Sequence, residues 1–354
     1  MGNTPKQGYT LKQIVGSGLL DVPRFEWRLH SSWLRICNRS ERLTASADGR
    51  GVACDWQWTS DLHAPKVFPS LGVRLMARCM RDWPVVFAPA PQERGGEIQV
   101  SFIVGHRGRE RLPLLLATLA TVAAQRGVSC ECIVVEQSNQ GEIANLLPPW
   151  VRYLHTPLPA PAMAYCRSWA FNVGARAARG RLLVFHDNDM LIPQAYASEA
   201  WARSQEGYEV VNLKRFIFYL TEAHSGAICG GDRRLSAAPA EAIMQNAEAG
   251  GSIVVSRDAF FAIGGYDEAF VGWGGEDNEF WQRALTRKVW QYAYLPLAHL
   301  WHAPQPDKEK LDRQSASQFA QRSSVPPDRR IGELAQRGFG DARQMDPPWP
   351  RGES

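Results

Sequence analysis

The stretch LLVFHDND (residues 182–189) joins four apolar residues to two carboxylates that stand two positions apart. A short apolar run of this kind predicts a buried strand. Ligands of open α/β sheets bind beyond the carboxyl ends of the strands, which is where these acids would lie. Because residues two apart in extended chain point the same way, Asp187 and Asp189 are expected to face one ligand.

Working outward from this stretch, strands alternate with helices. Further strands are predicted at 98–104, 132–135 and 252–256, and helices at 112–125 and 169–179. Gly180 would end the second helix as a C-cap. This alternation predicts an α/β fold with a parallel, doubly wound sheet.

The amino-acid composition and the pattern of apolar residues change at both ends of this region. Residues 1–95 hold five Trp residues among short apolar runs and turn signals, which predicts an accessory module of short strands and turns. A linker rich in Pro and Gly separates this module from a main domain at 96–304. Residues 305–354 are rich in Pro, Gln, Asp and Arg, and we expect a mobile lid followed by a loosely ordered tail.

Composition narrows the class of protein. The formal net charge of +4 fits an anionic ligand but does not indicate nucleic acid, and the seven Cys show no paired metal-binding spacing. Residues 1–20 lack the apolar core of a signal peptide, and no run approaches the roughly 20 apolar residues of a membrane helix. We therefore expect a cytoplasmic protein, and the sequence leaves open a peripheral attachment to a membrane.

The Asp pair predicts a metal site. Two hard oxygen ligands suit Mg²⁺ or Mn²⁺ bridging to a diphosphate, whereas the plainer alternative is a solvated Asp/Asn turn. His299 and His302 come much later, and they share a face only if the segment forms a helical turn. An imidazole added to the carboxylates would favour Mn²⁺ over Mg²⁺.

Cations and one further acid are candidates for nucleotide contact. Arg107 and Arg109 follow the first predicted strand, and Lys214 and Arg215 lie in a later apolar run. Glu136 ends the second strand, where an acid could accept hydrogen bonds from a base or a ribose. For each of them an ordinary surface or turn residue is the alternative.

A third candidate region is VGWGGEDNEFW (residues 271–281), in which glycines and an aromatic precede three acids. Glu276, Asp277 and Glu279 fall in the first turn of a predicted helix, where the helix dipole stabilises acids. Side chains of helix neighbours point about 100° apart, so Glu276 could hold a substrate hydroxyl while Asp277 accepts its proton. Glu279 is interpreted as a helix-start charge only.

Together these motifs resemble nucleotide-sugar glycosyltransferases of the GT-A fold. The resemblance spans about 97–310 and is greatest to the β-1,4-galactosyltransferase family and to bacterial family-2 enzymes, including chondroitin-polymerase-type domains. It is carried by segments that occur in the family's order: 102–109, 134–137, 171–174, 185–189, 250–257 and 273–277. The most specific of these segments is WGGED, at 273–277. The fold that it implies is a doubly wound mixed sheet flanked by helices.

The resemblance also implies roles for single residues. Asp189 would bind Mn²⁺ with His302, and Asp187 would lie beside the ribose and the metal. His299 falls where the family often places a Met ligand. Asp277 would be the general base and Glu276 a sugar ligand. The donor sugar would lie along the following residues: Gly251, Trp273, Gly274 and Gly275. The family's Pro-Phe-Arg-Asn-Arg loop is altered here to GHRGR (105–109), a departure that bears on the nucleotide contacts.

The leading hypothesis is an inverting, metal-dependent transferase. It would move galactose or N-acetylgalactosamine from a UDP-sugar to a hydroxyl of a glycan or glycoconjugate, with Mn²⁺ or Mg²⁺ as cofactor. One alternative is a glycan- or nucleotide-binding protein on the same scaffold without turnover. The other is a phosphotransferring or hydrolytic metal enzyme that uses the Asp pair.

Overall fold

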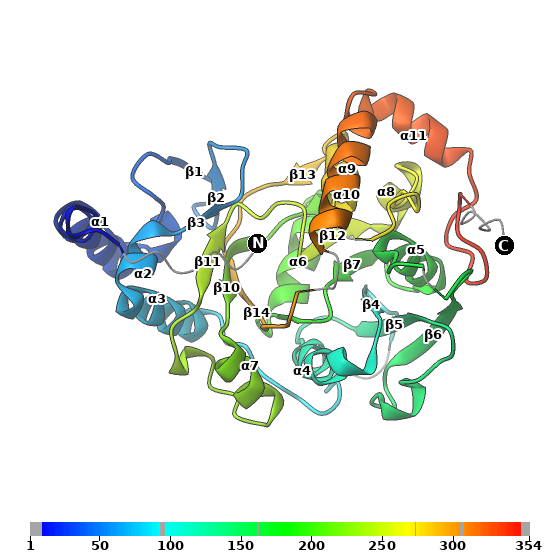
Figure 1. The fold of residues 1–354 in the computed structure, drawn as a ribbon, viewed down its shortest axis with the longest axis horizontal. Coiled ribbons are helices and arrows are strands. Elements are labelled where there is room, and N and C mark those ends of the chain that lie inside the picture. Colours follow the sequence, from blue (N-terminus) through cyan, green and yellow to red (C-terminus); the bar gives the residue numbers. More distant parts are fainter. Residues whose placement is uncertain (1–8, 93–95, 162, 273, 305–307, 348–354) are drawn as a thin grey trace.

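The computed structural model describes residues 9–92, 96–161, 163–272, 274–304 and 308–347, and its centre is a seven-stranded sheet (Figure 1). The strand order is β13-β9-β12-β7-β4-β5-β6. The strands have these bounds: β4 (Val100–His106), β5 (Cys130–Ser138), β6 (Arg152–Pro157), β7 (Leu182–His186), β9 (Val210–Val211), β12 (Ser252–Ser256) and β13 (Val289–Trp290).

Helices cover both faces of this sheet. Alternation within β4 shows how the faces differ: Phe102 and Val104 pack with α4 and α6, whereas Ile103 packs with α5 and α8. Because both faces are buried, the strands read as continuous apolar runs. These helices are α4 (Leu112–Ala123), α5 (Arg167–Ala177), α6 (Tyr196–Gln205), α8 (Arg257–Ala262) and α9 (Glu276–Ala284).

The sheet is mixed rather than parallel throughout. Strands β6, β5, β4 and β7 run parallel, but β12 pairs antiparallel with both β7 and β9. The predicted α/β class with a mixed, helix-flanked sheet is confirmed, and the wholly parallel sheet expected from alternation alone is wrong. The 252–256 strand matches β12 at both ends, but an apolar run does not encode its direction.

A second sheet of five strands, ordered β3-β11-β10-β14-β8, lies beside the first. Strands β10 and β14 are parallel, and β8 pairs antiparallel with β14. Its strands are β3 (Ser60–Asp61), β8 (Met190–Leu191), β10 (Lys214–Tyr219), β11 (Ala242–Gln245) and β14 (Leu295–His299), and α7 (Glu222–Cys229) follows β10. Since β8 follows β7 closely, residues 187–189 form the passage between the two sheets.

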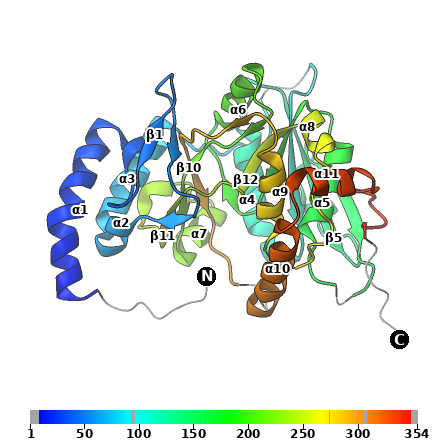
Figure 2. The ribbon, with the colours of Figure 1, turned by 90° about the horizontal axis from the view of Figure 1, so that it is seen from above.

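The N-terminal region is mainly helical, so the expectation of short strands and turns is wrong. It contains α1 (Leu11–Ser31), α2 (His63–Val67) and α3 (Pro69–Asp82), with a hairpin of β1 (Leu43–Ala45) and β2 (Val52–Cys54). The helices lie at one end of the molecule (Figure 2). Apolar residues of α1 and α3 are spaced as on one face of a helix and pack with Phe216 of β10: Phe25, Leu29, Leu71 and Leu75. The prediction missed this helical spacing because it relied on the turn signals and the Trp residues. Among the described residues, no helix is long and apolar enough to cross a membrane.

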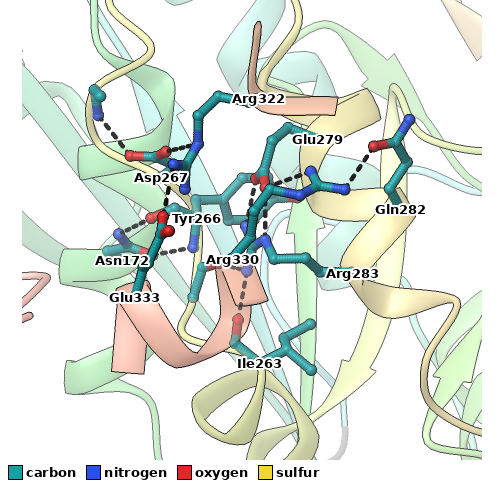
Figure 3. Close-up of polar contacts among 12 residues, drawn as sticks. Asn172, Ile263, Tyr266, Asp267, Glu279, Gln282, Arg283, Arg322, Arg330 and Glu333 are labelled. Carbon is teal, nitrogen blue, oxygen red and sulfur yellow. Dashed lines mark hydrogen bonds and ion pairs between the residues drawn. The ribbon is translucent and has the colours of Figure 1, made fainter. Parts of the chain in front are cut away.

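The segment after residue 307 forms α10 (Lys308–Ser323) and α11 (Pro327–Ala335) rather than a loosely ordered tail. Ion pairs hold both helices in place (Figure 3). Arg330 of α11 lies 2.9 Å from Glu279 of α9, and Arg322 of α10 lies 3.2 Å from Asp267. The polar residues of this segment therefore form buried ion pairs. Composition alone cannot distinguish a segment ordered in this way from a disordered one.

Glu279 is also more than a helix-start charge. Its side chain is fully buried and pairs with Arg283 at 2.6 Å as well as with Arg330. Although burial disfavours the charged carboxylate, the two guanidinium groups lower the pKa of Glu279. Glu279 thus stays ionised and ties α11 to α9.

We predict that Glu279→Gln destabilises the protein by about 3–5 kcal/mol, because it leaves Arg283 and Arg330 buried without their counter-charge. Urea unfolding would measure the change in the free energy of unfolding. Glu333→Gln is the matched control, since Glu333 is half exposed and pairs with Arg322 and Arg329, so its loss should cost less than about 1 kcal/mol. Equal effects of the two substitutions would contradict the structural role of Glu279.

Candidate active site

One carboxylate and two imidazoles meet at the passage between the sheets. His299, the last residue of β14, pairs in register with Met190 of β8, which brings it beside Asp189. The Nε2 atoms of His299 and His302 lie 3.6 Å and 3.3 Å from the Asp189 carboxylate oxygens. The three ligand atoms lie within 4.8 Å of one another, which is the spacing of a metal site.

The chemistry of this cluster fits a divalent cation. Asp189 is buried, and its Oδ1 has no hydrogen-bond partner among the described residues. Burial disfavours its charge, but His299, His302 and Arg111 hold the pKa of Asp189 below its usual value, so the carboxylate is ionised. An anionic oxygen without a donor and two imidazoles form a suitable ligand set for a first-row divalent metal.

Asp187 points to a different partner. Arg167, at the start of α5, contacts Asp187 at 2.5 Å, Asp277 at 2.5 Å and Glu276 at 3.2 Å. The metal cluster among the described residues therefore contains Asp189, His299 and His302 without Asp187. Asp187 instead connects that cluster, through Arg167, to the two acids at the start of α9.

Three carboxylates around one guanidinium leave a surplus of negative charge. Burial raises the pKa of Asp277 to about 7, with Glu276 and Asp187 adding to the rise and Arg167 opposing it. Burial disfavours the charged guanidinium, but the three acids raise the pKa of Arg167 well above its usual range. Asp277 is thus a carboxylate that can gain or lose a proton near neutral pH.

Glycines place Glu276 and Asp277 at this position. Gly275 caps α9 with φ +89°, and Gly274 has φ +91°, both in the region that favours glycine. A Cβ on Gly275 would also come within 3.1 Å of the Ser315 carbonyl oxygen of α10. Trp273, which the resemblance places along the donor sugar, lies outside the described residues.

Lys214 and Arg215 do not act together, because neighbouring strand residues point to opposite faces. The Lys214 ammonium donates to the Ser252 carbonyl at 2.5 Å, and burial lowers the pKa of Lys214 to about 7. Arg215 instead donates to the Leu34 carbonyl at 2.8 Å and to the Ile36 carbonyl. Arg215 therefore joins the N-terminal region to β10, which corrects its predicted place in the nucleotide site.

The other residues predicted to contact the nucleotide are Glu136, Arg107 and Arg109. Glu136 accepts hydrogen bonds from the Tyr153 hydroxyl at 2.6 Å and from the amides of Glu142 and Ile143, so it serves to hold the chain after β5. Arg107 donates to the Met163 carbonyl at 2.8 Å, and Arg109 is exposed.

Gly251 lies next to the Asp pair. Its carbonyl accepts from the Asp187 amide at 3.0 Å, and a Cβ there would lie 2.8 Å from Met190 Cε. A glycine at this position, with φ +83°, therefore lets the chain approach the passage between the sheets.

Two site residues escaped the sequence-based prediction. Arg111 contacts Asp189 at 3.2 Å and the His302 Nδ1 at 2.9 Å, and it lies only two positions beyond the loop that was considered. Arg167 has partners 20, 109 and 110 positions away, so no local pattern marks it. Only a tertiary structure could show that this arginine holds the site together.

Comparison with known proteins gives one match in sequence. The model of the N-terminal domain of galactosyltransferase matches residues 237–298, a segment that contains β12, α8 and the three acids of α9 and ends one residue before His299. No curated protein matches the chain. Among solved structures, the mannosyltransferase PcManGT from Pyrobaculum calidifontis, in complex with GDP-Man and Mn2+, is similar at 15% identity and a TM-score of 0.43. That similarity covers 75% of this chain and 76% of the other.

The matched segment supports the predicted resemblance at its most specific motif. It includes Glu276 and Asp277, and the structure brings these acids to the passage that carries Asp189. The matched segment supports similarity to galactosyltransferases, and the mixed sheet flanked by helices agrees with the α/β fold that the resemblance implies.

Proposed function

We propose that this protein is an inverting, metal-dependent hexosyltransferase that uses a UDP-sugar, with galactose or N-acetylgalactosamine the favoured donor. The acceptor would be a hydroxyl of a glycan or glycoconjugate. The observation that carries the proposal is the connection of two centres through Arg167. The metal-type cluster of Asp189, His299 and His302 lies on one side, and Glu276 and Asp277 on the other.

The cluster would hold Mn²⁺, with Mg²⁺ as the alternative ion. Such an ion supplies charge that stabilises a diphosphate leaving group. Asp189, His299 and His302 would hold it, and Asp187 would lie between the cluster and Arg167. Arg111 would keep Asp189 ionised through its contact with that carboxylate.

Asp277 would act as the general base. As an acceptor hydroxyl oxygen forms its bond to the anomeric carbon, the bond from that carbon to the diphosphate breaks and its electron pair stays on the diphosphate. The hydroxyl proton passes to Asp277, and the attack from the opposite face inverts the configuration. Glu276, held 3.2 Å from Arg167, would bind a sugar hydroxyl.

We predict that Asp189→Asn weakens Mn²⁺ binding by at least about tenfold, measured by calorimetry, because it removes the anionic ligand. Asp187→Asn is the matched control, since its carboxylate contacts Arg167 rather than the His pair. It should keep an affinity close to that of the wild type. Greater loss in Asp187→Asn than in Asp189→Asn would refute this division of roles.

We predict that Asp277→Asn lowers kcat by about 10²–10⁴-fold, the usual contribution of a general base, while Mn²⁺ affinity is kept. UDP release would be measured with a panel of UDP-sugars and mixed acceptors. Asp258→Asn, an exposed acid at the start of α8, is the control and should transfer normally. Near-normal transfer by Asp277→Asn would exclude Asp277 as the base. If the wild-type protein binds a donor but releases no UDP, the alternative of a binding protein without turnover is favoured.

The pH dependence follows from the same carboxylate. A base must be deprotonated to act, and the pKa of Asp277 is raised to about 7. The value of kcat/KM should therefore fall about tenfold per unit below pH 7, rather than only below pH 4 as for an unperturbed Asp. A profile that stays flat from pH 7 to pH 5 would contradict the role of Asp277.

A further inference from the structure

A cavity of about 190 Å³ lies in the N-terminal region, away from the carboxylates and imidazoles of the candidate active site. Its lining includes Arg24 and Arg28 of α1, Cys37 and Arg39. A phosphate or carboxylate group consists of a few water-sized atoms, so it fits within this volume. Phe25, Leu62 and Ala64 contribute apolar walls.

Arg24 and Arg28 stand four residues apart, so they lie on one face of α1. Their partners are neutral: Arg24 donates to the Arg39 carbonyl at 3.1 Å and contacts the Cys37 sulfur at 3.9 Å, and Arg28 donates to the same sulfur at 3.3 Å. Within the part of the chain that the structure describes, neither arginine has a carboxylate within ion-pair distance. Two guanidinium groups offer ten N–H donors, of which these contacts use three.

The acid in the cavity wall is already neutralised. Asp21 accepts two hydrogen bonds from Arg39, at 2.9 Å and 3.2 Å. The Asn38 amide group donates to Glu41 and to the Asp61 carbonyl, and its oxygen accepts from the His63 amide. The hydrogen-bonding capacity that Arg24 and Arg28 leave unused is therefore cationic and consists of donors.

The surrounding region has the same sign of charge. Residues 9–92 contain eleven Lys and Arg against seven Asp and Glu, an excess of four that equals the net charge of the entire chain. The arginines of α3 do face acids: Arg74 pairs with Glu26, and Arg78 and Arg81 pair with Asp82. Arg24 and Arg28 are thus set apart by facing a cavity instead of a counter-charge.

We propose that this cavity is a binding site for an oxyanion group, a phosphate or a carboxylate, carried by a small ligand or by one end of a longer one. Planar guanidinium groups bind both kinds of oxyanion through paired N–H donors. The apolar wall would contact the carbon atoms that carry the anion. This site is separate from the proposed transfer reaction and does not depend on it.

Cys37 makes the site testable locally, because its sulfur lies between the two arginines. Alkylation by iodoacetamide would be followed residue by residue by mass spectrometry, with inorganic phosphate or glucuronate added at constant ionic strength. Either anion should slow alkylation of Cys37 but not of Cys229, which is also half-buried and lies in α7. An anion at the metal centre would not protect Cys37, so the readout is independent of the active site.

Arg28→Gln should weaken this protection by about tenfold or more, because each charge-assisted donor contributes the free energy of a tenfold change in binding. Lys12→Gln is the matched control, since it removes one charge from α1 outside the cavity. Circular dichroism and thermal unfolding would confirm that both variants fold. Protection by phosphate alone would indicate a phosphorylated ligand and by glucuronate alone an acidic sugar. Protection by neither anion, or equal protection in Arg28→Gln, would overturn the proposal.

Discussion

The candidate active site depends on the contact of one arginine with three acids. Arg167 bridges Asp187 at the end of β7 to Glu276 and Asp277 at the start of α9, elements that are far apart in sequence. A single positive charge cannot balance three neighbouring carboxylates, so the site keeps a surplus of negative charge at the passage between the two sheets. Burial raises the pKa of Asp277 and the surplus adds to the rise, and the same surplus makes the neighbouring cluster suitable for a cation.

The two sheets give this contact its geometry. Strand β7 belongs to the larger sheet and β8 to the smaller, so the chain between them must carry Asp187, Asn188 and Asp189 across the junction. Pairing of β8 with β14 then sets His299 beside Asp189 without any helical turn between the two histidines. The sequence-based argument required such a turn for His299 and His302 to act together, and strand pairing achieves the same result.

The sequence predicted well those features that are local in the chain. The central strands and the helix that begins at Glu276 follow from short motifs. The cluster of Asp189 with His299 and His302 joins residues far apart in the sequence, and strand pairing brings them together. The roles of Arg167, Arg215 and Glu279 did not follow, because their charges are balanced by partners that are brought near only by folding. A buried ion pair and a surface charge look the same in sequence, as α10 and α11 show: their polar composition suggested a loose tail.

Burial also separates residues that the sequence treats as equivalent. Lys214 and Arg215 are adjacent cations on one strand, but opposite faces of β10 give them different environments. Arg215 is fixed by backbone carbonyls of the N-terminal region, so that region is bonded to the second sheet and helps to hold β10. Because β10 pairs with β14, the position of His299 rests in turn on this attachment. The N-terminal helices thus support the metal-type cluster through β10 without contributing a ligand to it.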